Sequence, residues 1–285
     1  MSPDDLSLLL PEWQGSGRDP AVAAGARAIA ALFDVGEFVE VGAPDVEALT
    51  VDAGVLGLAS IAERTKQTLA VLAERQPARV FTVGGNCGVE LGPVSYLNAR
   101  YRGNLAVVWL DAHADLNTPE SSPSGCFHGM VLRTLLGAGP AALVDALPRP
   151  LDPPQIVLAG ARDLDRDEAT FISNAAISLL NPADVLVPDR VAGRIRAGAF
   201  TRVYLHVDVD VLDPVEFPDA LVPSPDGLSL ANLTWLLRDL ASRFDVVGFS
   251  VVEFRPRSVT GLARLGELLS RSSIDIGAMT ARRAS

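Results

Sequence analysis

Three side chains that could bind a metal ion follow the apolar run at residues 105–110: Asp111, His113 and Asp115. Residues two apart on a strand point to the same side, so the three side chains would converge if the chain stays extended. Two carboxylates and an imidazole at the end of a buried strand would repel one another or remain desolvated without a cation between them. A divalent metal ion would satisfy this cluster, and an ordinary polar loop is the alternative.

A second acidic cluster follows the apolar run at residues 203–207, where Asp208 and Asp210 again lie two apart. His206 would share their side of the strand, either as a structural hydrogen-bonding group or as a further metal ligand that compensates for Cys87, a cysteine at the end of the strand predicted at residues 79–83 and a softer ligand than histidine. Carboxylates with some imidazole favour Mn²⁺ over Zn²⁺, which prefers cysteine and histidine. Four carboxylates around one ion would carry too much charge, so we expect two ions bridged by aspartates, with a hydroxide held between them.

These clusters belong to a chain in which apolar strands alternate with helical patterns. Strands are predicted at residues 6–10, 37–41, 79–83, 105–110, 155–159, 177–180, 203–207 and 246–252, and helices at 21–33, 58–72, 89–100, 130–136, 168–173, 190–197, 230–240 and 261–276. Near-continuous apolar strands that alternate with helices indicate an α/β fold whose parallel sheet is covered on both faces. Ligands bind such sheets at the carboxyl ends of the strands, which is where the acidic clusters lie.

Length and composition narrow the class of protein further. The chain has 285 residues, of which 48% are hydrophobic, and no linker divides it, so residues 1–285 are expected to form a single domain. It shows no signal-peptide pattern and no run of about 18 apolar residues, which predicts a cytoplasmic protein without a membrane partner. The net charge of −11 argues against nucleic acid as a partner and is compatible with a small cationic substrate. Two cysteines, Cys87 and Cys126, imply no disulfide framework.

Three motifs in this chain resemble the arginase (ureohydrolase) family. They are DAHADLNTP…SG…HG at Asp111–Gly129, HVDVDVLDP at His206–Pro214, and Glu253 at the end of the last strand. The resemblance implies a three-layer α/β/α sandwich with a mostly parallel sheet, in agreement with the alternation of strands and helices. It also implies a homo-oligomer, either a trimer or a hexamer.

The same resemblance implies two Mn²⁺ ions with shared ligands. Asp111 and Asp208 would bridge both ions, His113 and Asp210 would complete one of them, and Asp115 would serve the other. The bridging hydroxide would then attack the guanidinium carbon of the substrate.

Catalytic roles also follow from the resemblance. Asp115 would accept a proton from the hydroxide, His128 would shuttle protons at the mouth of the pocket, and Glu253 would pair with the guanidinium group.

The substrate end of the site can be carried over in the same way. Asn117 and Ser124 match positions at which arginases hold the α-carboxylate, and Asp165, within RDLD, matches the acid that orients the α-amino group, supported by Asp163 and Glu168. Agmatinases, whose substrate lacks the carboxylate, typically do not have the NTP…SG loop. Hydrolysis of L-arginine or a close α-amino-acid analogue to L-ornithine and urea is therefore favoured over an agmatinase activity. Hydrolysis of a formimidoyl amino acid is disfavoured by the same residues.

One position departs from the family pattern. The family motif GGDHS reads GGNCG at residues 84–88, so Cys87 stands where a metal-binding histidine belongs. Because a thiolate is a soft ligand and a poor one for Mn²⁺, three outcomes are open. Cys87 binds a softer metal, or the second ion is weak or absent so that one ion binds, or the protein is a catalytically silent metal- or arginine-binding member. The change also resembles the N-hydroxy-L-arginine amidinohydrolase of D-cycloserine biosynthesis, which releases hydroxyurea.

Overall fold

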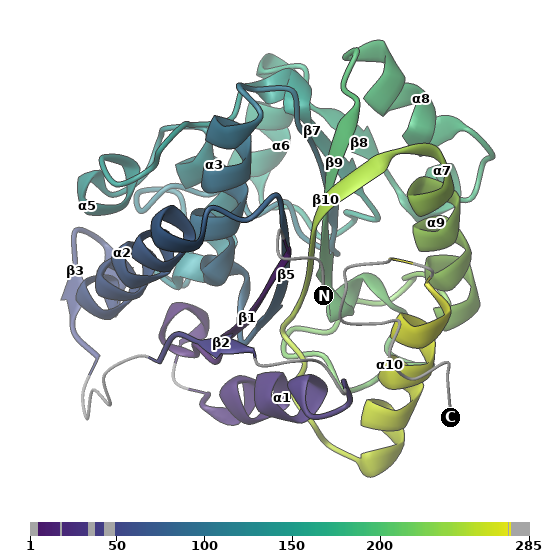
Figure 1. Cartoon of the computed structure of the whole chain (residues 1–285), viewed down its shortest axis with the longest axis horizontal. Helices are drawn as coiled ribbons and strands as arrows, with labels where there is room; N and C mark the ends of the chain where they lie inside the picture. The colour runs from purple at the N-terminus through teal and green to yellow at the C-terminus, as the bar shows by residue number, and fades with distance from the viewer. Residues whose placement is uncertain (1–4, 18, 34–37, 43–48, 273, 275–285) are drawn as a thin grey trace.

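The computed structural model describes residues 5–17, 19–33, 38–42, 49–272 and 274, and its centre is a parallel sheet. Within these residues, eight strands lie in the order β2-β1-β5-β10-β9-β6-β7-β8, and each neighbouring pair is parallel (Figure 1). The strands are β1 (Asp5–Leu10), β2 (Val39–Glu40), β5 (Arg79–Gly84), β6 (Ala106–Leu110), β7 (Ile156–Ala159), β8 (Ser178–Leu180), β9 (Arg202–Asp208) and β10 (Asp245–Val252). A separate antiparallel pair consists of β3 (Val51–Asp52) and β4 (Val55–Leu56).

Helices cover both faces of the sheet. One face is covered by α1 (Ala21–Ala30), α7 (Pro182–Val185), α8 (Arg190–Ala197), α9 (Leu230–Arg243) and α10 (Val259–Arg271). The other is covered by α2 (Leu58–Arg75), α3 (Leu91–Arg100), α4 (Val131–Leu135), α5 (Ala141–Val144) and α6 (Arg166–Asn174). The expected three-layer α/β/α fold is therefore confirmed.

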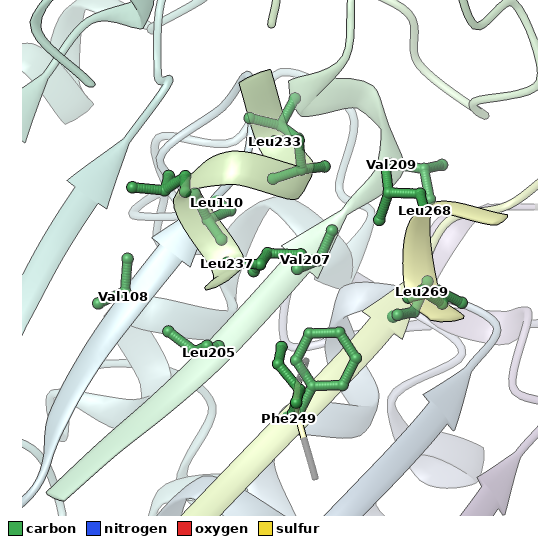
Figure 2. Packing of buried hydrophobic residues seen from close by; sticks show 14 of the residues in the cluster. Val108, Leu110, Leu205, Val207, Val209, Leu233, Leu237, Phe249, Leu268 and Leu269 are labelled. Atoms are coloured by element: carbon green, nitrogen blue, oxygen red, sulfur yellow. The ribbon is translucent and has the colours of Figure 1, made fainter. Parts of the chain in front are cut away.

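The central strands are buried on both faces, which explains their nearly unbroken apolar sequences. In β6, Val108 and Leu110 lie on the face covered by α9 and belong to the same apolar cluster as Leu233 and Leu237, and Figure 2 shows Leu110 beside these two leucines. The alternate β6 residues, including Trp109, belong to the core on the opposite face. Each large apolar side chain buried in this way contributes about 1.5–3 kcal/mol to stability, so the central strands are firmly held.

The predicted elements are present with shifted ends. The strand predicted at residues 37–41 appears as β2, and its first residue, Glu37, lies outside the described residues. The final helix ends at Arg271, earlier than expected, and the predicted end at Ile276 also lies outside them. Short 3₁₀ turns that the sequence patterns did not indicate follow several strands, including η2 (Cys87–Glu90) and η5 (Val209–Val211). No helix in the described part of the chain is both long enough and apolar enough to cross a membrane.

Candidate active site

Four neighbouring strands end at one edge of the sheet and bring their following residues together. Strands β5, β10, β9 and β6 lie side by side in this order. Cys87 follows β5, Glu253 follows β10, Asp208 ends β9 and Asp111 follows β6. All four side chains are buried. The parallel sheet thus unites residues separated by as many as 166 positions in the sequence.

The two aspartate pairs adopt the same local turn instead of the extended geometry expected from the sequence. Oδ1 of Asp111 accepts a hydrogen bond from the backbone N–H of His113 at 2.7 Å, and Oδ1 of Asp208 accepts one from the N–H of Asp210 at 2.8 Å. An aspartate that binds the backbone two residues further on closes an Asx-type turn. The expectation that these side chains converge because they alternate along an extended strand is therefore wrong. The turns orient His113 and Asp210, the second residue of each pair.

The two turns meet at His113. Its Nδ1 lies 3.0 Å from Oδ2 of Asp210 and 3.4 Å from Oδ1 of Asp111. The backbone N–H of Ala112 donates to Oδ1 of Asp210 at 2.9 Å, which fixes the carboxylate. The ligand atoms of Asp111, His113 and Asp210 lie within 4.8 Å of one another, so these residues can surround one metal ion.

Cys87 lies at the centre of a second set of ligand atoms. Its Sγ is 3.2 Å from Oδ2 of Asp208, and its backbone N–H donates to Oε1 of Glu253 at 3.2 Å. Cys87, Asp208 and Glu253 offer atoms within 4.8 Å of one another, as do Cys87, Asp111 and His206. The thiol therefore faces the same acids that a histidine ligand at this position would face.

A buried ion pair supports the loop that carries Cys87. Asn86 accepts a hydrogen bond from the N–H of Gly88 at 2.7 Å and donates one to the carbonyl oxygen of Glu12 at 2.9 Å. The carboxylate of Glu12 lies 3.0 Å from Nε of the buried Arg64. A Cβ atom at Gly85 would lie 1.9 Å from the Glu12 carbonyl oxygen, so this close approach requires glycine.

Asp115 and Glu253 have unusual backbones and unpaired oxygens. Their φ angles are 53° and 62°, in the left-handed region that residues other than glycine rarely adopt. Oδ2 of Asp115 and Oε2 of Glu253 are buried and have no hydrogen-bond partner among the described residues. Such strain and unpaired polar atoms concentrate at functional sites. Asp115 is outside the three convergent sets of ligand atoms within the described chain, so its role as a ligand stays a prediction.

Burial and crowding shift the pKa values of three acids in this cluster upward, whereas at Asp111 burial is outweighed by the nearby His113 and His206, which lower the pKa. Burial, reinforced by Asp111, raises the pKa of Asp115 well above its ordinary value. Burial and the charge of Asp210 do the same to the pKa of Asp208, and burial and Asp111 raise the pKa of Asp210 to about 6. Burial together with Asp115 raises the pKa of the Cys87 thiol. Divalent cations would relieve this repulsion, so the donor set fits a metal centre.

His128 contacts the same oxygen of Glu253 that accepts the hydrogen bond from the backbone N–H of Cys87. Its Nδ1 lies 3.2 Å from Oε1 of Glu253, and its side chain is partly exposed to the pocket. Burial lowers the pKa of His128, but the hydrogen bond to Glu253 outweighs this effect and raises the pKa above its ordinary value. A partly exposed imidazole with a raised pKa can hold and release a proton near neutral pH.

A pocket of about 300 Å³ connects the buried acids with the polar residues predicted to hold the substrate. Asn117 Nδ2 donates to Oδ2 of Asp165 at 2.8 Å, and Ser124 also lines the pocket. Glu168 accepts hydrogen bonds from the N–H groups of Leu116 and Asp165 at 2.9 Å each. It therefore connects the backbone beside Asn117 with the backbone of Asp165. The pocket thus has buried acids at one part and, at another, the exposed Ser124 and Asp165 beside the buried Asn117.

Two buried residues beside the site have contacts that the sequence motifs did not indicate. Trp109 Nε1 donates to Oδ2 of Asp111 at 3.0 Å, so it orients an expected ligand as well as packing in the core. Glu90 is fully buried, and its Oε1 lies 3.5 Å from Nδ1 of His206. Its place three residues after Cys87, in an otherwise apolar segment, was the signal that could have identified it.

Comparisons with known proteins point to one family. A model described as the arginase family matches residues 19–269. The arginase of Staphylococcus aureus (strain MRSA252) is 36% identical over 180 residues, which are 61% of this chain and 59% of that protein. The arginase of Entamoeba histolytica is 29% identical over 187 residues, 62% of each chain. The matched part therefore spans less than two thirds of the length of these curated relatives.

Solved structures show the same likeness over more of the chain. The native arginase of Bacillus caldovelox at pH 5.6 is 27% identical with a TM-score of 0.79, covering 94% of this chain and 97% of that one. The Entamoeba histolytica arginase in complex with L-ornithine has a TM-score of 0.84 at 23% identity, with the same coverage, which supports the fold.

Proposed function

Because this chain belongs to the arginase family, we propose that it hydrolyses the guanidino group of L-arginine or of a close α-amino-acid analogue. With arginine, the products are L-ornithine and urea. The pocket of about 300 Å³ carries the proposal, because it joins the buried Asp208 and Asp210 to a hydrogen-bonded polar pair, the buried Asn117 and the exposed Asp165. This distribution suits a small molecule with a cationic group at one end and an amino-acid group at the other.

The proposal includes a centre of two divalent metal ions, with Mn²⁺ as the expected metal. Asp111, His113 and Asp210 would hold one ion, and Asp115, Asp208 and Cys87 would contribute to the other, with Asp111 and Asp208 shared. When bound, such ions act as Lewis acids and activate water as a nucleophile at neutral pH. The unpaired oxygen of Asp115 and the raised pKa values of the acids support this assignment. A single ion is the alternative, because Cys87 is a poor ligand for Mn²⁺.

Three residues of the pocket would act on the substrate or on protons. The unpaired Oε2 of Glu253 is available to the N–H groups of a guanidinium, and a charge-assisted pair of this kind is strong and directional. Asp115 would accept the proton that water loses, since its Oδ2 is unpaired. His128, partly exposed beside Glu253, would carry protons between the pocket and solvent.

The amino-acid end of the substrate would lie against the exposed side of the pocket. Asn117 and Ser124 would donate hydrogen bonds to the α-carboxylate, and Asp165 would orient the α-ammonium group. The 2.8 Å hydrogen bond between Asn117 and Asp165 supports this division, since it holds a donor for the carboxylate next to an acceptor for the ammonium.

A substrate panel tests the proposed function. Purified protein with Mn²⁺ is assayed against arginine, N-hydroxyarginine, agmatine and guanidinobutyrate, and urea or hydroxyurea is measured directly. Turnover of arginine or N-hydroxyarginine above that of agmatine is the expected result. No turnover of any guanidino compound would exclude an amidinohydrolase and favour a silent metal- or arginine-binding protein, for which metal content is the second measurement.

N-Hydroxy-L-arginine is the second candidate substrate, and Cys87 is the observation that favours it. The thiol lies 3.2 Å from Asp208, among the expected ligands, which would weaken binding of the ion on that side. A substrate with a more acidic and more nucleophilic N–OH group depends less on a complete pair of ions. Release of hydroxyurea faster than urea in the same panel would identify this substrate.

The proposal extends to the organisation of the whole chain. The eight-stranded parallel sheet contains both β1 and β10, which lie near the two ends of the described chain, and this supports a single domain over residues 1–285. Relatives of this kind lead us to expect a trimer or a hexamer, which sedimentation analysis of the purified protein would distinguish from a monomer.

A further inference from the structure

His206 is a fully buried residue of β9 that the proposed reaction does not use. Its Nε2 lies 3.8 Å from Sγ of Cys87 and 3.9 Å from Oδ2 of Asp111. The distance to the carboxylate is too long for a hydrogen bond, and the distance to sulfur allows only a weak one. One ring nitrogen therefore faces two other ligand atoms without a strong bond to either.

The spacing of these three ligand atoms matches what a small tetrahedral cation needs. With ligand bonds of about 2.0–2.3 Å, neighbouring ligand atoms of a four-coordinate zinc ion lie about 3.3–3.8 Å apart. The distances from Nε2 of His206 to Cys87 and Asp111 are close to this range, and all three ligand atoms lie within 4.8 Å of one another. A thiolate, a carboxylate and a neutral imidazole carry two negative charges together, which one divalent cation balances.

The surroundings fix His206 in this orientation. Its ring stacks on Trp109 with centroids 3.5 Å apart and an angle of 16° between the ring planes. On the side away from Cys87, Nδ1 lies 3.5 Å from Oε1 of Glu90 and 3.3 Å from Oγ of Ser250. Histidines that bind metals usually give their other ring nitrogen to a carboxylate or a similar acceptor, which fixes the tautomer. Glu90 is fully buried, its oxygens accept no other well-formed hydrogen bond among the described residues, and it shares its surroundings with the buried Tyr204, so it can act as the acceptor for Nδ1 of His206.

We propose that Cys87, Asp111 and His206 form a sulfur–oxygen–nitrogen site for a borderline divalent cation of the zinc or cobalt class. The inference rests on the proposed metal centre but not on its reaction, and at the ion that Cys87 and Asp111 share it gives His206 the place that the proposed function gives to Asp115 and Asp208. The site differs in chemistry from Asp111, His113 and Asp210, whose carboxylates and single imidazole suit Mn²⁺. Asp111 presents Oδ1 to His113 and Oδ2 toward His206, so it can serve both positions. The centre would then hold two different metals, and the thiol of Cys87 would lose its proton to solvent on binding.

Cobalt binding tests the site without any assay of turnover. The metal-free full-length protein is titrated with Co²⁺, and we expect a thiolate-to-cobalt charge-transfer band in the near ultraviolet. Cys87→Ser should abolish the band, and His206→Gln should raise the dissociation constant of Co²⁺ at this site by at least about tenfold. Cys126→Ser is the matched control, because it removes the other free cysteine and should leave the band unchanged.

Two results would overturn the inference. One is the absence of a charge-transfer band in wild-type protein, and the other is a band and a Co²⁺ affinity that His206→Gln leaves unchanged. X-ray absorption of the wild-type protein with Zn²⁺ is a second measurement, which needs no variant to fold. A zinc coordination shell without sulfur and imidazole would also overturn the inference. Turnover without the cobalt band would contradict this site alone, whereas the band without turnover would contradict only the proposed reaction.

Discussion

The thiol of Cys87 lies 3.2 Å from Oδ2 of Asp208, at a position where the arginase family pattern has an imidazole. The contact places a soft sulfur atom among hard carboxylate oxygens. At this position the chain differs from the arginase family pattern that its other expected ligands follow.

Replacement of Cys87 by histidine should raise the Mn²⁺ content of the purified protein. An imidazole nitrogen suits Mn²⁺ better than a thiolate does, and the residue already faces Asp208. Elemental analysis after dialysis against Mn²⁺ measures the effect, with Cys126→His as the control. An unchanged Mn²⁺ content would show that Cys87 is not at a ligand position.

Replacement of Asp165 by asparagine should raise the KM for arginine by about tenfold, a loss of about 1.4 kcal/mol of binding. The carboxylate is expected to orient the α-ammonium group, and it accepts a hydrogen bond from Asn117 at 2.8 Å. Steady-state kinetics would show a smaller effect with an N-acetylated arginine, which has no such charge. Asp167→Asn, in the exposed first turn of α6, is the control, and an equal effect there would refute the assignment.

Replacement of His128 by asparagine should lower kcat by about 10²–10⁴-fold, the range for loss of a proton-transferring group. The KM and the metal content should change little, since His128 contacts Glu253 and is outside the convergent ligand sets of the described chain. Rescue of kcat by added imidazole would support the proton shuttle. A rise in KM at constant kcat would instead indicate a role in substrate binding.

The metal-free protein should lose stability as pH rises from about 4 to about 6. Burial and Asp111 raise the pKa of Asp210 from its ordinary 3.8 to about 6, so the folded protein keeps a proton that the unfolded chain has released in this window. The free energy of unfolding therefore falls with rising pH. Urea unfolding in the presence of a chelator measures the slope, which should be shallower in Asp210→Asn. With metal bound, the free energy of unfolding should instead rise with pH, because the ligands must be deprotonated to bind the metal.

Replacement of Arg64 by methionine should destabilise the fold by about 3–5 kcal/mol, because it leaves the buried carboxylate of Glu12 without its partner. The two groups lie 3.0 Å apart, each with 2% of its side chain exposed. Urea unfolding of the double variant with Glu12→Gln should recover part of the loss. The exposed pair of Arg27 and Glu40 provides the control, since Arg27→Ala should change stability by no more than about 1 kcal/mol.

The sequence by itself determined the layered fold and the residues that meet at the site. Apolar runs such as residues 106–110, alternating with helical patterns, are typical of a parallel sheet covered on both faces, and parallel strands place all their carboxyl ends at one edge. The membership of Asp111 and Asp208 in the site could therefore be predicted from the residues that precede them in the sequence.

Only the tertiary structure decided how the side chains of the site are oriented and which buried residues contact them. Turns after β6 and β9, not strand alternation, orient His113 and Asp210, because the hydrogen bond from each aspartate to the backbone bends the chain. The contact of His206 with Cys87 and with Glu90 joins residues from β9 and the segment after β5, which are not adjacent in the sheet. Such distances depend on side-chain packing across the sheet, which no local pattern in the sequence encodes.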